Sequence, residues 1–184
     1  MEASVMGQTL NIETAKMAPN MSLQEVKMGG NVVQKQVFDG EKGASSGMQG
    51  SQKIEGDEAK DMALSSALIE EIAFLENGVE MKLSSVENID GNDTYGVEVT
   101  MPSGKKSTRY YDSESGLLVR TTNVLEGPQG SMTLSTDYQD YKEFEGVMLP
   151  TTIKQPMNAQ MKMDIKVIDV VVNGEVTKED FKVE

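Results

Sequence analysis

Apolar and polar residues alternate along most of the second half of the chain, as they do in half-buried β-strands. Tyr95, Val97, Val99 and Met101 would share one face of such a strand, and the residues between them are polar or glycine. Short runs rich in Gly, Pro, Asn, Asp and Ser separate these segments. This spacing predicts an up-and-down meander of antiparallel strands.

The first part of the chain carries similar signals. Gly29–Gly30 between two alternating segments is a strong signal for a two-residue hairpin. Residues 43–56 are rich in Gly and Ser, which predicts a loop or a frayed strand with a mobile tip. In all we expect about ten strands. They fall at residues 3–16 (a pair or one bulged strand), 21–28, 32–38, 80–86, 95–101, 106–112, 117–125, 132–141, 147–153 and 161–167.

The period changes between residues 57 and 76. Leu64, Leu68, Ile72 and Leu75 recur at helical spacing, which predicts one amphipathic helix with a single apolar face. Asp57 is the expected N-cap, and Asn77–Gly78 is the expected left-handed stop. A short tail ends in Phe181, which we expect to cover a sheet edge.

These elements predict one domain over residues 1–184, mainly β with some helix (α+β). The expected architecture is a large curved antiparallel sheet, or half-open β-barrel, with one main helix packed on it. A long sheet curls to cover its apolar face, and one helix covers only part of that face. We therefore expect an apolar groove. Because the strand pattern starts abruptly near the first residue, we expect a domain cut from a longer chain, or a mature form.

Apolar side chains on the predicted strands are the candidate ligand-binding residues. Met is soft and adaptable, and the chain has 14 of them. The alternative interpretation is that these residues are ordinary core. The candidates are Val97, Val99, Met101, Met132, Leu134, Met163 and Ile165.

Composition removes several function classes. The net charge is -13, with 30 acidic and 17 basic residues, which makes nucleic acid a poor partner. The chain has no Cys and no His, so thiolate nucleophiles, Cys-ligated zinc and the commonest general base are missing. Acidic turns at 90–93 and 112–114 do not match the calcium-loop template. We therefore expect no enzyme, no cofactor, no metal and no transmembrane segment, and the first residues lack the features of a signal peptide.

One set of motifs resembles a known superfamily. Residues 104–120 contain GKK and YYDSESGLLVR, and they are followed by Asp140–Tyr141, by EGVMLP at 145–150 and by VTKEDF at 176–181. Together these resemble the outer-membrane lipoprotein-sorting superfamily, in the type found in Bacteroidetes, alone or attached to insulinase-type zinc peptidases. The resemblance implies a half-open barrel in the bacterial periplasm or cell envelope that holds acyl chains in an apolar cavity.

Two functions follow as hypotheses. The first is a non-catalytic carrier or binding domain for an acyl chain, a lipoprotein or another apolar ligand. The second is an accessory or interaction domain beside an insulinase-type peptidase, with a protein partner. An insulinase-type site needs a His-x-x-Glu-His helix, and this chain has no His, so the domain itself would not be catalytic. An unrecognised hydrolase is the third and weakest alternative.

Overall fold

The computed structural model describes residues 1–5, 8–48, 50–127, 130–156 and 162–183. These residues form two compact units, which are described separately. The first contains residues 1–79 and 169–184, and the second contains residues 80–168. The grouping of residues 1–184 into one domain stays a prediction. No helix in the described ranges is both long and apolar enough to cross a membrane.

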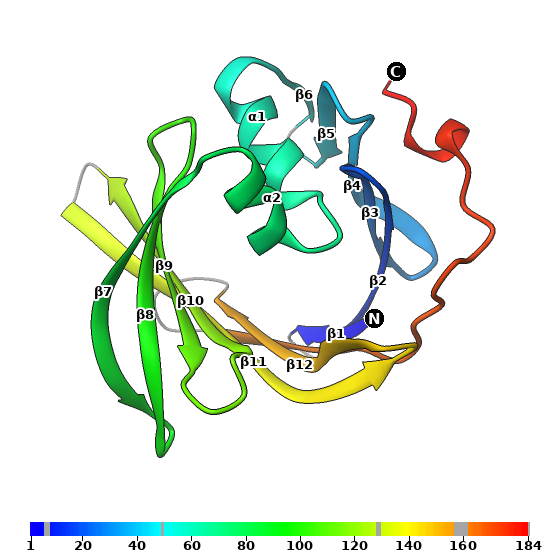
Figure 1. Ribbon diagram of the computed structural model, residues 1–184. Helices are drawn as coiled ribbons and strands as arrows, with labels where there is room; N and C mark the ends of the chain where they lie inside the picture. Colours follow the sequence, from blue (N-terminus) through cyan, green and yellow to red (C-terminus); the bar gives the residue numbers. More distant parts are fainter. Residues whose placement is uncertain (6–7, 49, 128–129, 157–161, 184) are drawn as a thin grey trace. The chain divides into compact units, whose positions relative to one another are not determined.

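The first unit contains an antiparallel sheet in the strand order β6-β5-β4-β3-β2-β1. Neighbours in the sequence are therefore neighbours in the sheet (Figure 1). The hairpin between β3 and β4 turns at Gly29–Gly30, as predicted. The strands are β1 (Glu2–Val5), β2 (Gln8–Met17), β3 (Met21–Met28), β4 (Asn31–Phe38), β5 (Gly43–Gly47) and β6 (Gly50–Ile54).

The loop interpretation of residues 43–56 is wrong, and the strand alternative is right, because most of this segment forms β5 and β6. The expected tip includes residue 49, which lies outside the described residues. Close packing explains why one of the small residues of this segment, Gly43, has no side chain. A Cβ there would lie 2.8 Å from the Val37 carbonyl oxygen and 3.3 Å from the Met62 sulfur. The small residue lets the sheet and the following helix approach closely.

The single helix predicted for residues 57–76 is two helices, α1 (Gly56–Ser65) and α2 (Glu70–Glu76). The predicted N-cap is also wrong. Glu55 holds the N-cap position without a side-chain hydrogen bond, and Asp57 instead pairs with Lys60 in the first turn at 2.8 Å. The predicted stop is confirmed, since Gly78 has a φ of 65° and the Val79 N–H donates to the Phe74 carbonyl.

The core of the first unit is built on aromatic side chains. Phe38, Phe74 and Phe181 are fully buried. Phe181 ends the 3-10 helix η1 (Lys178–Phe181), which contacts β3. Because β3 has a neighbouring strand on each side, η1 does not cover a sheet edge, and that expectation is wrong.

The second unit contains seven antiparallel strands in the order β13-β12-β11-β10-β9-β8-β7. This is the predicted meander, and β7 to β12 follow one another across the sheet (Figure 1). Among the described residues the chain has thirteen strands, more than expected from sequence, mainly because of β5 and β6. The strands are β7 (Glu80–Ile89), β8 (Asn92–Thr100), β9 (Lys106–Asp112), β10 (Leu118–Gly127), β11 (Gly130–Phe144), β12 (Val147–Pro156) and β13 (Lys162–Lys166).

Candidate functional site

The strand register places the candidate residues of β8 and β11 on one face of the second unit's sheet. Val99 is opposite Ser107, Ser107 is opposite Asn123, and Asn123 is opposite Leu134. Directly opposed residues point to the same side of a sheet, and so do residues two apart in one strand. Val97 and Met132 therefore share this face with Val99 and Leu134.

The same face continues to the other edge strand. Ile165 is opposite Ile153, which is opposite Tyr138, and Tyr138 lies four residues beyond Leu134 on β11. Met163 is two residues from Ile165 on β13 and shares its side. Six of the seven predicted residues thus lie on one face, which we call the apolar face. It contains Val97, Val99, Met132, Leu134, Met163 and Ile165.

Burial divides these six residues. Val99 is 1% exposed and Ile165 is 6% exposed, so both are core side chains, as the alternative interpretation held. Val97, Leu134 and Met163 are half-buried, and Met132 is 38% exposed. The seventh residue, Met101, lies just beyond β8, where its backbone N–H donates to the Lys105 carbonyl across the turn. The structure therefore does not gather all seven around one cavity.

A groove of about 290 Å³ opens near one end of this sheet. Leu134 is the only predicted residue that lines it in the described part of the chain. Sequence reasoning missed the other lining residues, since several are polar and come from strand ends. They are Lys105, Lys106, Asn123, Val124, Thr136, Gln155 and Pro156. This volume lies just below the range of ligand pockets, which begins at about 300 Å³.

The apolar face also carries a polar pair. Val97 is opposite Arg109, and Arg109 is opposite Thr121. The Thr121 hydroxyl oxygen is buried and has no hydrogen-bond partner among the described residues. A buried hydroxyl without a hydrogen-bond partner costs free energy in the folded chain.

The opposite face of the second sheet is polar. Arg120 and Asp137 form an ion pair there, and the Thr122 and Ser135 hydroxyls lie 3.0 Å apart. The pKa of the Tyr110 phenol is raised by burial and by the negative charge of Glu87, while Arg120 opposes the shift. The two faces therefore differ in character, and the apolar one suits an apolar ligand.

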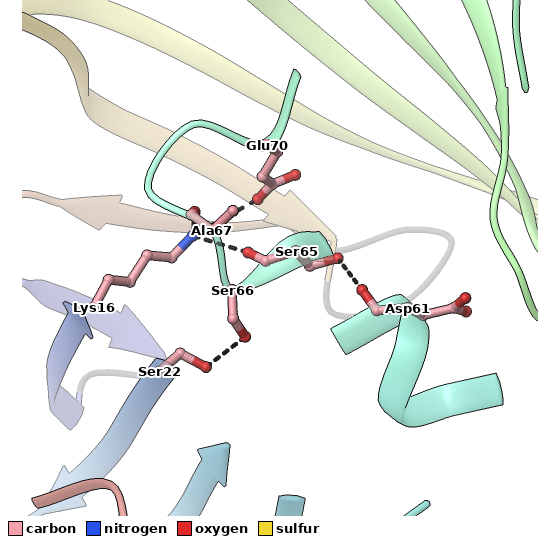
Figure 2. A network of polar contacts seen from close by, with 7 residues as sticks. All are labelled: Lys16, Ser22, Asp61, Ser65, Ser66, Ala67 and Glu70. Atoms are coloured by element: carbon pink, nitrogen blue, oxygen red, sulfur yellow. Dashed lines mark hydrogen bonds and ion pairs between the residues drawn. The ribbon is translucent and has the colours of Figure 1, made fainter. Parts of the chain in front are cut away.

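In the first unit, Lys16 of β2 holds the segment between the two helices (Figure 2). Its ammonium group donates to the carbonyl oxygens of Ser65 at 2.9 Å and Ala67 at 3.0 Å. The same nitrogen lies 3.8 Å from the Glu70 carboxylate at the start of α2. A cation at these carbonyls also complements the negative end of the α1 dipole.

Two serines add a second attachment. The Ser22 hydroxyl of β3 lies 2.7 Å from the Ser66 hydroxyl, and both are drawn in Figure 2. The Ser65 hydroxyl turns back and donates to the Asp61 carbonyl at 3.1 Å. Lys16 and Ser22 thus supply hydrogen bonds to the Ser65 and Ala67 carbonyls and to the Ser66 hydroxyl. These bonds stabilise the non-helical segment between α1 and α2.

Most of the apolar face predicted for a single helix is exposed in the two helices that form. Leu64 is buried, whereas Leu68 is 59% exposed and Leu75 is 69% exposed. Ile69 and Ile72 are also exposed. The expectation that Leu64, Leu68, Ile72 and Leu75 pack together on the sheet is wrong. We call Leu68, Ile69, Ile72 and Leu75 the helical apolar patch.

The described residues contain no cluster of three or more acidic side chains arranged to hold a metal ion. The sequence itself has no His and no Cys, so the usual nucleophile–base pairs are not available. The chemical property that the apolar face supplies is apolar surface, whose removal from water is favourable.

Neither a protein-family model nor a curated protein sequence matches this chain. Three solved structures share its fold. A LolA superfamily protein from Nitrosomonas europaea is 14% identical, with a TM-score of 0.64, over 99% of this chain and 86% of that one. A DUF1329 family protein from Desulfovibrio piger is 13% identical, with a TM-score of 0.60, over 98% and 86%.

The third structure is a domain named for outer-membrane lipoprotein sorting, from Vibrio parahaemolyticus. It is 11% identical, with a TM-score of 0.62, over 95% of this chain and 81% of that one. At these identities the likeness concerns the fold. It confirms the predicted fold class, a mainly β structure built on a large antiparallel sheet.

Proposed function

We propose that this chain is a non-catalytic binding or carrier domain for an acyl chain, a lipoprotein or another apolar ligand. The observation that carries the proposal is the apolar face of the second unit, where six predicted residues lie on one side of a sheet that ends in a groove. Burial of a methylene there contributes about 0.8 kcal/mol. The fold shared with lipoprotein-sorting and LolA superfamily proteins supports the same class of ligand, and with it a place in the bacterial periplasm or cell envelope.

Native mass spectrometry of the purified chain, with an organic extract of the same sample, tests this proposal. We expect a bound mass that matches an acyl lipid, or uptake of one equivalent of a fatty acid or lipopeptide by the delipidated chain. Leu134→Asp places a charge in the groove lining and is expected to abolish uptake. Val32→Asp changes a half-exposed apolar residue of β4 in the first unit and serves as the matched control. Failure of the unaltered chain to take up any of these lipids contradicts the proposal.

A second candidate is an accessory or interaction domain of an insulinase-type zinc peptidase, in a Bacteroidetes chain. The helical apolar patch favours it, because exposed apolar side chains grouped within eight residues are typical of protein-docking surfaces. Purified peptidase encoded with this chain should bind it, and the double substitution Leu68→Ser and Ile72→Ser should weaken that binding. A coding region with no peptidase in the same chain or beside it argues against this candidate.

A further inference from the structure

Strand β7 is an edge strand of the sheet in the second unit. Within the described ranges it pairs with β8 alone, and no strand lies along its other edge. Most of its side chains are exposed, and the apolar ones are among them. Leu83 is 59% exposed and Val86 is 64% exposed. An edge strand with exposed apolar side chains is a template for pairing with another chain.

A β-bulge decides which side of β7 each residue occupies. Leu83 and Ser85 lie opposite two consecutive residues of β8, so Ser84 between them is the extra residue. The Ser84 hydroxyl donates to the Gly96 carbonyl at 2.9 Å across the strand pair. In a regular strand, residues an odd number of positions apart point to opposite sides of the sheet. One inserted residue reverses this rule for two residues that flank it.

The bulge therefore groups the side chains of β7 by chemical type. The β8 partners of Leu83 and Val86 are two residues apart, so these two side chains point to one side, that of the apolar face. The β8 partners of Lys82 and Glu87 are four residues apart, so these two share the opposite side. The strand thus carries an apolar pair on one side and two opposite charges on the other.

These pairs are complementary to their own copies about a two-fold axis. If two copies of β7 run antiparallel with the axis just after Ser84, Leu83 of each copy faces Val86 of the other. In the same register Lys82 faces Glu87, and each contact occurs twice because the axis repeats it. Opposed apolar pairs and opposed charges of unlike sign both stabilise antiparallel strands.

We infer that the outer edge of β7 pairs antiparallel with β7 of a second copy of this chain in a closed two-fold dimer. Each chain contributes its one β7 edge, so the assembly ends at two chains. A single pair of strands joins little surface compared with the roughly 1,600 Å² of a typical stable interface. The net charge of -13 on each chain also opposes association, so the dimer is weak and reversible. This inference concerns an interaction surface and does not depend on the proposed ligand.

Sedimentation velocity of the delipidated chain from about 10 to 500 µM covers the range in which weak dimers form. The mass should rise from that of one chain toward that of two. Lys82→Glu places a like charge opposite Glu87 at both contacts and should weaken the dimer roughly 5- to 100-fold. Adding Glu87→Lys to this variant restores unlike charges at both contacts and should restore the dimer.

The control for net charge is Lys142→Glu, at an exposed position of β11. It changes the charge of the chain by the same amount as Lys82→Glu but lies on a strand with neighbours on both sides. It should therefore weaken the dimer far less. Far-UV circular dichroism checks that each variant folds.

Introduced cysteines test the register, because the chain has no Cys of its own. A mixture of the Leu83→Cys and Val86→Cys chains in oxidised glutathione should give a disulfide between the two variants. Two copies of the Leu83→Cys chain should not cross-link. Their cysteines would lie about 10 Å apart along the strands, whereas a disulfide needs Cα atoms within about 7 Å.

Three results would overturn the inference. A chain that stays monomeric at the highest concentration does not pair through β7. A dimer that responds neither to the charge exchange nor to the cysteines uses another surface. Growth beyond two chains would mean that β7 pairs with a different edge in a head-to-tail arrangement, which does not close. Lipid uptake is measured separately, so none of these results decides the proposed function.

Discussion

Arg120 and Asp137 lie opposite each other on β10 and β11, and the Arg120 Nε donates a hydrogen bond of 2.5 Å to the Asp137 carboxylate. The Asp137 side chain is 9% exposed, whereas the Arg120 side chain is 28% exposed. A second acid, Asp90, lies 4.0 Å from the same arginine. The pair joins two of the strands that carry the apolar face, from the opposite side of the sheet.

Asp137→Ala is expected to lower the free energy of unfolding by about 2 to 3 kcal/mol, because it leaves the Arg120 guanidinium partly buried without its main partner. Urea unfolding followed by circular dichroism measures the loss. Asp164→Ala, at an exposed position of β13, should change stability by less than about 0.5 kcal/mol. Equal losses in the two variants would contradict a structural role for the ion pair.

Phe74 and Leu75 are neighbours on α2 with opposite environments, since Phe74 is fully buried and Leu75 is largely exposed. Phe74→Ala should cost about 3 kcal/mol of unfolding free energy, because it leaves a cavity in the core of the first unit. Leu75→Ala should cost less than about 0.5 kcal/mol. Denaturant unfolding of the two variants checks which side of α2 is buried. A large loss of unfolding free energy for Leu75→Ala would mean that Leu75 belongs to the core, as the sequence predicted.

Lys16→Met should loosen the segment between α1 and α2 with little effect elsewhere. It removes the donor to the Ser65 and Ala67 carbonyls, and hydrogen bonds from a partly exposed charged group contribute about 1 kcal/mol each. Amide hydrogen exchange should become roughly 5- to 30-fold faster in residues 65–76, which corresponds to the loss of one or of both bonds, and stay unchanged in β9 to β11. Lys60→Met, which breaks only an exposed pair with Asp57, is the control. Faster exchange throughout the chain would show that Lys16 supports global stability.

The pKa of Asp112 lies below its usual value, mainly because the Ser115 backbone N–H and then its hydroxyl donate to the carboxylate, with a smaller contribution from the Glu114 N–H. Ser115→Ala removes the hydroxyl donor and keeps the backbone N–H donors, so this pKa should rise only part of the way toward its ordinary value. A titration of carboxyl carbon chemical shifts between about pH 2 and 6 measures it. The pKa of Asp180 is lowered by hydrogen bonds that its carboxylate accepts from the Thr177 backbone and side chain. It should not change in this variant and is the internal control.

The direction of the pH effect follows from the sign of this shift. A carboxyl whose pKa is lowered by folding stabilises the folded chain above its unfolded pKa. That contribution is lost as the pH falls through the lowered folded value. Ser115→Ala should therefore reduce the difference in stability between neutral and acidic pH. An Asp112 pKa that does not rise at all in this variant would mean that the Ser115 hydroxyl makes no contribution to the shift.

The sequence predicted the strands best where one side of a strand is apolar and the other polar. The shared side of Val97 and Val99 on β8, and that of Met132 and Leu134 on β11, follow from that alternation, whereas the register that joins the two pairs on one face comes from the structure. Residues 43–47 gave no such signal, because their side chains are small. Their strand forms because β4 and β6 pair with it on either side.

The groove could not be predicted from apolar alternation. Its lining combines Leu134 with polar residues from four strands and a turn, and no local period connects them. Which strand ends lie next to one another is determined by the register, which local periodicity does not specify.

Local periodicity and turn chemistry, both written in the order of the residues, determined the meander, its hairpins and the sidedness of its strands. Contacts distant in sequence decided the rest. The break between α1 and α2 depends on Lys16 and Ser22, which lie more than forty residues earlier in the chain. The burial of Phe181 likewise depends on β3. A helical pattern specifies which residues share a side, but the free energy of packing decides whether that side is covered, and packing depends on partners that the local sequence does not contain.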